Sequence, residues 1–142
     1  MGSSILRFVL GVVAGTVVMF LVIMGIEFAG HMIYPPPPGI DPSNINDVAR
    51  MMAAAPVGAL AFVVLAWVVG AFAGGFVAAK ISRTWPRTAA IVTGLVVLAG
   101  VVAMIQQVPG HPTWMAILGL ILPVPAALLG ARLVRPKAMP SL

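Results

Sequence analysis

The sequence lacks cysteine and has very few charged side chains. Without cysteine the chain has no disulfide, no thiolate metal site and no cysteine nucleophile. Charged residues make up 8% of its 142 residues, against about 25% in an ordinary soluble domain. Eight basic and three acidic residues give a net charge of +5. The basic residues are scattered between apolar segments and form no phosphate-binding stripe. The composition therefore excludes a soluble domain and a nucleic-acid partner.

Apolar residues make up 61% of the chain and the mean hydropathy is +1.13. Four stretches carry almost no polar side chain, namely residues 8–26, 57–79, 89–105 and 114–131. Each reaches the length of about 17–25 residues that a helix needs to cross a bilayer. Because a helix satisfies all its backbone groups internally, the sequence predicts an all-α membrane protein whose first partner is the lipid bilayer.

The segments between these stretches predict the architecture of a single membrane domain, residues 1–142. The turns around residues 84 and 110 are short, which favours a four-transmembrane up-down helix bundle. The expected transmembrane helices are residues 5–30, 56–80, 88–107 and 113–134, with an outer loop at 31–55 and a cytoplasmic tail at 135–142. Pro123 and Pro125 predict a kink in the last helix.

The outer loop is rich in proline and predicts a short interfacial helix. Four prolines, residues 35–38, favour an extended segment. The residues that follow contain the side chains of a helix start, with Asp41 or Ser43 as the expected N-cap of a helix from Asn44 to Ala54. Its apolar residues, including Met51 and Met52, suit a helix lying at the membrane surface.

Basic residues fall on one side of the predicted membrane. An even number of crossings puts seven of the eight together, and Arg50 alone lies opposite. These seven are Arg7, Lys80, Arg83, Arg87, Arg132, Arg135 and Lys137. Because cytoplasmic loops of membrane proteins are enriched in Lys and Arg, the bias predicts that both termini are cytoplasmic.

Small residues recur at four-residue spacing and predict close helix packing. The expected packing face consists of Gly11, Gly15, Gly58, Ala66, Gly70, Gly74 and Ala78. Two interpretations stay open. The face packs helices within one chain, or it meets a second copy or another membrane protein.

Polar and titratable residues gather on the predicted outer side. Glu27 and His31 are four residues apart, so they share one face of a helix. The other members of this expected polar or ion site are Asp41, Asp47, Gln107 and His111. Three roles stay open for it: a structural ion pair, a proton or cation site, and a divalent-metal site built on Glu27, His31 and His111. No nucleotide loop, metalloprotease motif or catalytic serine pattern is present, so neither an enzyme nor a cofactor is expected.

Two sequence runs, EFAGHMIYPPPPGID from Glu27 to Asp41 and AWVVGAFAGG from Ala66 to Gly75, resemble small four-helix inner-membrane proteins of bacteria. The resemblance implies the architecture and the location but no activity. The face of small residues and the lack of polar residues at mid-membrane depth favour a structural or accessory role through helix–helix contacts, in a homo-oligomer or a larger membrane complex. The alternative is a small proton or cation carrier or channel with Glu27 and His31 at its outer mouth. A third expectation is an outward-facing binder of divalent metal.

Overall fold

The structure is a computed structural model that describes residues 2–134, and this range is helical, without strands. The helices are α1 (Gly2–Ile33), α2 (Ile45–Ala54), α3 (Val57–Ser82), α4 (Pro86–Gln107), α5 (Thr113–Ile121) and α6 (Pro123–Arg132). Helices α1, α3 and α4 are each long and apolar enough to cross a membrane, and α5 and α6 together form a fourth candidate span. The prediction of an all-helical chain with four candidate membrane spans is thus confirmed for the described residues. The expected tail, residues 135–142, lies outside the described residues.

The four spans differ in length. Helix α1 has 32 residues and the α5–α6 span has 20, which correspond to about 48 Å and about 30 Å at a rise of ~1.5 Å per residue. The hydrocarbon core of a bilayer is about 30 Å thick. Helix α1 therefore extends beyond the length that a bilayer requires, and its range is wider than the expected 5–30.

The break in the fourth span follows from its prolines. Pro123 and Pro125 have no amide hydrogen to donate to the preceding turn. Helix α5 ends at Ile121, and α6 begins at Pro123. Leu122 joins them, because its amide donates to the carbonyl of Leu118 at 3.0 Å and its carbonyl accepts from Ala126 at 3.0 Å. The backbone groups of Leu122 thus stay paired on both sides of the interruption.

The start of α2 differs from the sequence expectation. Asn44 is the N-cap, and its side-chain oxygen accepts from the amide of Asn46 at 3.0 Å. The expected caps were Asp41 and Ser43, which instead bind each other. The Asp41 carboxylate accepts from the Ser43 amide at 2.9 Å and from the Ser43 hydroxyl at 2.6 Å. Because these groups close a turn of their own, the helix begins one residue later.

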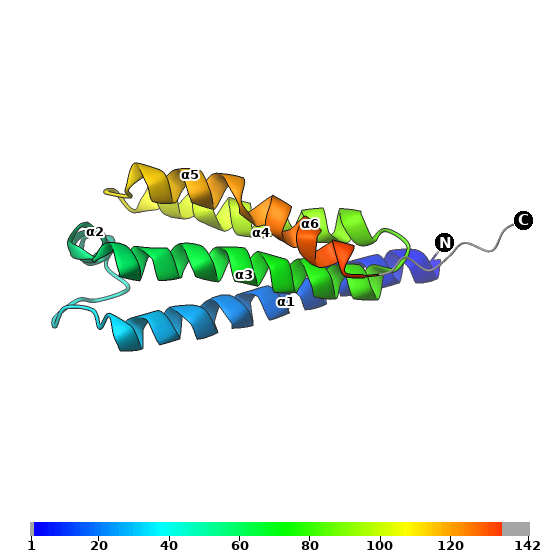
Figure 1. The fold of residues 1–142 in the computed structure, drawn as a ribbon, viewed down its shortest axis with the longest axis horizontal. Coiled ribbons are helices and arrows are strands. Elements are labelled where there is room, and N and C mark those ends of the chain that lie inside the picture. Colours follow the sequence, from blue (N-terminus) through cyan, green and yellow to red (C-terminus); the bar gives the residue numbers. More distant parts are fainter. Residues whose placement is uncertain (1, 135–142) are drawn as a thin grey trace, which may run out of the picture.

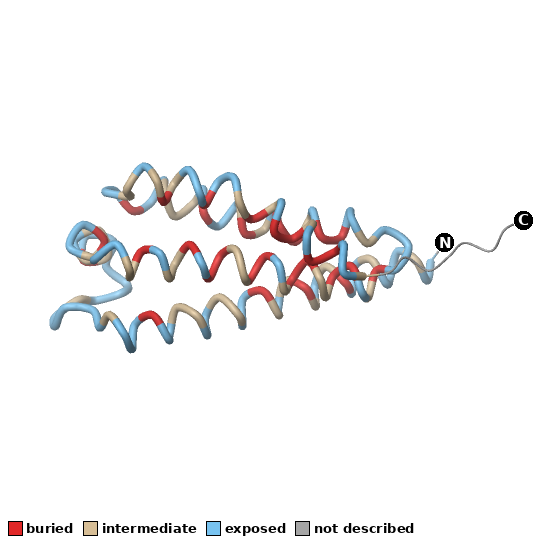
Figure 2. Tube along the Cα trace, in the orientation of Figure 1, coloured by how far each residue is buried: buried red, intermediate tan, exposed pale blue. Residues whose placement is uncertain are grey.

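Helix α3 lies at the centre, with α1 along one side and α4 and α6 along the other (Figure 1). Buried residues follow α3 and the sides of its neighbours that face it (Figure 2). The N-terminus, the α3–α4 connection and the end of α6 lie at one end of the molecule, which we call the terminal end. The segment from α1 to α3 and the α4–α5 turn lie at the opposite end, called the loop end.

Near the terminal end, α1 and α3 approach at backbone distance. A Cβ atom added to Gly15 would lie 2.5 Å from the carbonyl oxygen of Gly74, and one added to Gly11 would lie 2.7 Å from that of Ala78. A Cβ on Gly74 would in turn lie 2.7 Å from the carbonyl oxygen of Gly15. Most of the expected packing face therefore lies between two helices of the same chain.

Toward the loop end, side chains separate the same two helices. Ile23 fills the space above Gly70, where a Cβ would lie 2.6 Å from its Cγ1. Phe62 stands opposite Gly30, and Tyr34 covers Gly58. Of the expected packing face, Gly58 thus meets an aromatic ring and not a helix backbone, while Ala66 is fully buried in α3. This change from glycine to large side chains spaces α1 and α3 apart at the loop end.

Candidate functional site

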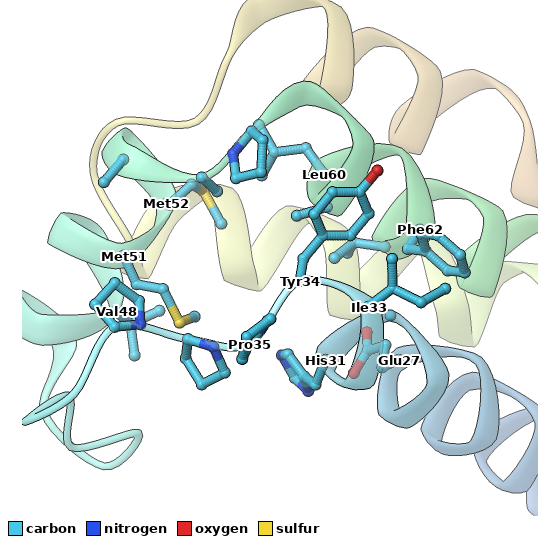
Figure 3. Close-up of a pocket in the computed structure, with 18 of the residues that line it drawn as sticks. Glu27, His31, Ile33, Tyr34, Pro35, Val48, Met51, Met52, Leu60 and Phe62 are labelled. Atoms are coloured by element: carbon cyan, nitrogen blue, oxygen red, sulfur yellow. The ribbon is translucent and has the colours of Figure 1, made fainter.

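The space between α1 and α3 at the loop end forms a cavity of about 480 Å³. Its walls are the last turns of α1, the proline segment, α2 and the first turns of α3, and Met104 of α4 also contributes to it (Figure 3). Most of the lining is apolar, including Ile33, Pro35, Met51, Met52, Leu60 and Phe62. The polar side chains on its wall are those of Glu27, His31 and Tyr34.

The local sequence explains how the loop closes over this space. Residues 35–37 are prolines without helix or strand structure, and prolines have no amide hydrogen that would need a partner. Helix α2 then lies over the start of α3 with its apolar side inward, because Val48, Met51 and Met52 line the cavity. Its Asn46 and Arg50 are exposed on the other side.

Glu27 and His31 both line the cavity and lie side by side (Figure 3). The carboxylate of Glu27 is half-buried, whereas His31 is exposed. Within residues 2–134 no hydrogen bond or ion pair joins the two or binds either side chain to another group. The shared face expected from their spacing is present, but the side chains are not locked to each other.

The acidic residues of the loop form a separate cluster. The carboxylate of Asp47 is paired with Arg50 and accepts from the Asp41 amide at 3.1 Å. The hydrogen bond from Arg50, with the bond from the Asp41 amide, holds the pKa of Asp47 below its ordinary value. The bonds from the Ser43 hydroxyl and amide lower the pKa of Asp41 in the same way. Both carboxylates are therefore ionised at neutral pH, and neither lines the cavity.

The remaining expected site residues lie on the α4–α5 turn and do not line the cavity either. Gln107 is exposed at the end of α4. His111 donates from Nδ1 to the carbonyl of Val108 at 2.8 Å, and its Nε2 is buried without a partner among the described residues. No three His, Cys, Asp or Glu residues in the described range could hold a metal together. The structure thus does not assemble the ligand set Glu27, His31 and His111.

Several cavity residues were absent from the site expected from the sequence. Tyr34, Leu60 and Phe62 line it, and so do Met51 and Met52. The apolar side of the short helix was visible in the sequence, and it is the signal that pointed to these methionines. The aromatic wall gave no such signal, because its position depends on the spacing between α1 and α3.

No family model, curated protein or solved structure matches the chain.

Proposed function

We propose that this chain is a multi-pass protein of the bacterial inner membrane with a structural or accessory role, and that it acts by helix contact and not as an enzyme. The observation that carries the proposal is the lack of a polar route along the spans. The buried polar residues of the described range are Asp47, Ser82 and Thr93. Asp47 lies in α2 at the loop end and Ser82 at the terminal end. The Thr93 hydroxyl donates to the carbonyl of Ala89 in its own helix at 3.0 Å.

The carrier or channel alternative is less well supported. A path for protons or ions through a membrane protein is built from polar side chains or broken helices at mid-depth. Glu27 and His31 line a cavity at the loop end. Nearer the terminal end, the close backbone approach of Gly15 in α1 and Gly74 in α3 leaves no space between these two helices. The break at Leu122 lies in an apolar sequence, and the Leu122 amide and carbonyl keep their helical hydrogen bonds.

We place the proposed partner surface on the outward side of α1. The small-residue stripe is occupied inside the chain, because Gly11 and Gly15 contact α3. The opposite side of α1 keeps large apolar residues exposed, with Leu21 at 63% and Phe28 at 68%. A second copy of the chain or another membrane protein is therefore expected to meet α1 through Leu, Phe and Val side chains and not through glycine.

Photo-crosslinking in native membranes tests this role. We expect a photoreactive residue at Leu21, on the outward side of α1, to give a discrete protein adduct. The same residue at Leu95, which is 47% exposed on α4, is the matched control and is expected to react with lipid alone. An adduct with twice the mass of the chain identifies a homo-oligomer, whereas an adduct of any other mass identifies a larger complex with a different protein. Lipid adducts alone at both positions contradict an accessory role through α1.

The proposed orientation places the terminal end in the cytoplasm. Arg7, Lys80, Arg83, Arg87 and Arg132 belong to that end, while the three acids and Arg50 belong to the loop end. Cytoplasmic segments attract this excess of positive charge. We expect a periplasm-active reporter to be silent when fused after Leu142 and active when inserted at Gly39. A cytoplasm-active reporter should give the reverse pattern, and activity of the periplasmic reporter at Leu142 would show the opposite orientation.

A further inference from the structure

We propose that the loop-end cavity is a binding site for an amphipathic organic cation, a molecule with a compact apolar body and one quaternary or protonated amine-like centre paired with Glu27. This inference goes beyond the accessory role, because it assigns a ligand to a site within one chain. It rests on the shape of the cavity, on the charge of its wall and on its aromatic side chains.

The cavity has the size and surface of a small-molecule site. Its volume of about 480 Å³ falls within the range of roughly 300–1,000 Å³ usual for such sites. Apolar side chains, among them those of proline, methionine, leucine and phenylalanine, make up most of the wall. These groups offer dispersion contacts and no strong hydrogen-bond donors. An apolar body fits this lining, whereas a sugar or another polar ligand would leave its hydroxyl groups unpaired.

The charge on the wall selects a cation. Glu27 contributes a half-buried carboxylate, and within residues 2–134 it has no ion-pair partner. No Lys or Arg lines the cavity, and the one Arg at this end, Arg50, is paired with Asp47. A nearby positive charge stabilises the ionised form of a partly desolvated carboxylate. An anionic ligand would find no Lys or Arg partner on the wall and would be repelled by Glu27.

Aromatic rings on the wall of the same cavity favour a diffuse cation. Tyr34 and Phe62 both line the cavity, with ring centroids 6.2 Å apart and planes at 62° to each other. This edge-to-face arrangement directs the rings toward different parts of the site. Aromatic faces attract quaternary ammonium and similar ions that cannot donate hydrogen bonds. Glu27 and the two rings together provide the elements of such recognition.

The test compares two ions of nearly the same shape and opposite charge, tetraphenylphosphonium and tetraphenylborate. Binding to the full chain in lipid nanodiscs is measured by equilibrium dialysis, with empty nanodiscs subtracted. We expect saturable binding of the phosphonium ion and none of the borate. Glu27→Gln should weaken phosphonium binding about tenfold or more, the equivalent of roughly 1.4 kcal/mol. Asp41→Asn, which removes an equal charge outside the cavity, should leave the affinity unchanged.

A second variant tests the location of the site. Ala59 lines the cavity from the first turns of α3, so Ala59→Leu should fill part of it and weaken phosphonium binding at least fivefold without lowering the thermal stability of the protein. Equal saturable binding of both ions would overturn the proposal, and so would an unchanged affinity in Glu27→Gln. If Glu27→Gln does not fold, binding of the two ions to the unaltered chain and to Ala59→Leu still tests the proposal.

Discussion

Gly74→Leu is expected to lower the free energy of unfolding by about 3 kcal/mol or more, at the upper end of the usual cost of overpacking a core. A single Cβ at this position would lie 2.7 Å from the carbonyl oxygen of Gly15, 2.8 Å from Cβ of Met19 and 3.0 Å from Cγ2 of Thr93. Two of these atoms belong to α1, and the third to α4. Because one is a backbone oxygen, a side-chain rotation cannot relieve the clash, and α1 must move away from α3.

The measurement is reversible unfolding in bicelles or mixed micelles, followed by helix content. Gly100→Leu is the matched control, since Gly100 also lies within a spanning helix but its added Cβ meets nothing within 4 Å. This control should be neutral or stabilised by up to about 1 kcal/mol, because glycine is a poor helix former. Equal stability of the two variants would show that α1 and α3 are not in backbone contact.

The sequence was sufficient to predict what depends on local composition. Helices long enough to span a bilayer follow from the length of the apolar runs, and the structure confirms four of them. The spacing of Gly11 and Gly15 indicated a close approach of helices. It did not identify the partner, because an isolated stripe packs equally well inside a chain or between chains. The structure places these residues against α3, where the facing residues Gly74 and Ala78 are also small.

The cavity depends on long-range packing, so the sequence did not predict it. It forms because Ile23 and Phe62 replace glycine-to-glycine contacts on the way to the loop end. Neither residue differs in type from many others in the spans. The spacing of Glu27 and His31 correctly indicated a common face, which both present to the cavity. The sequence did not predict which acidic residues line the cavity. Asp47 does not line it, because its carboxylate pairs with Arg50, three residues along the same helix.

The contact between Trp67 and Gly119 is expected to show strong energetic coupling. Trp67 is 6% exposed in α3, and a Cβ on Gly119 of α5 would lie 2.6 Å from its Cζ3 and 2.9 Å from Cγ1 of Val101. The indole thus fills the space that the glycine leaves, between α3, α4 and α5. Trp67→Ala should cost about 2–3 kcal/mol, below the roughly 3–5 kcal/mol of a soluble core. The cost is smaller because an unfolded span stays in lipid and retains its apolar surroundings.

Gly119→Leu alone should cost a further 1–3 kcal/mol or so, since the new side chain collides with the indole. In the Trp67→Ala background the same leucine enters the vacated space. The double variant should therefore be more stable than the sum of the single costs predicts, by about 1–2 kcal/mol. Leu65→Ala is the control on the same helix, because Leu65 is 48% exposed and its removal should add to Gly119→Leu without coupling. Strict additivity in both pairs would mean that α5 does not pack on Trp67, and the loop end of the α4–α5 hairpin would then have to be held to α3 by other contacts.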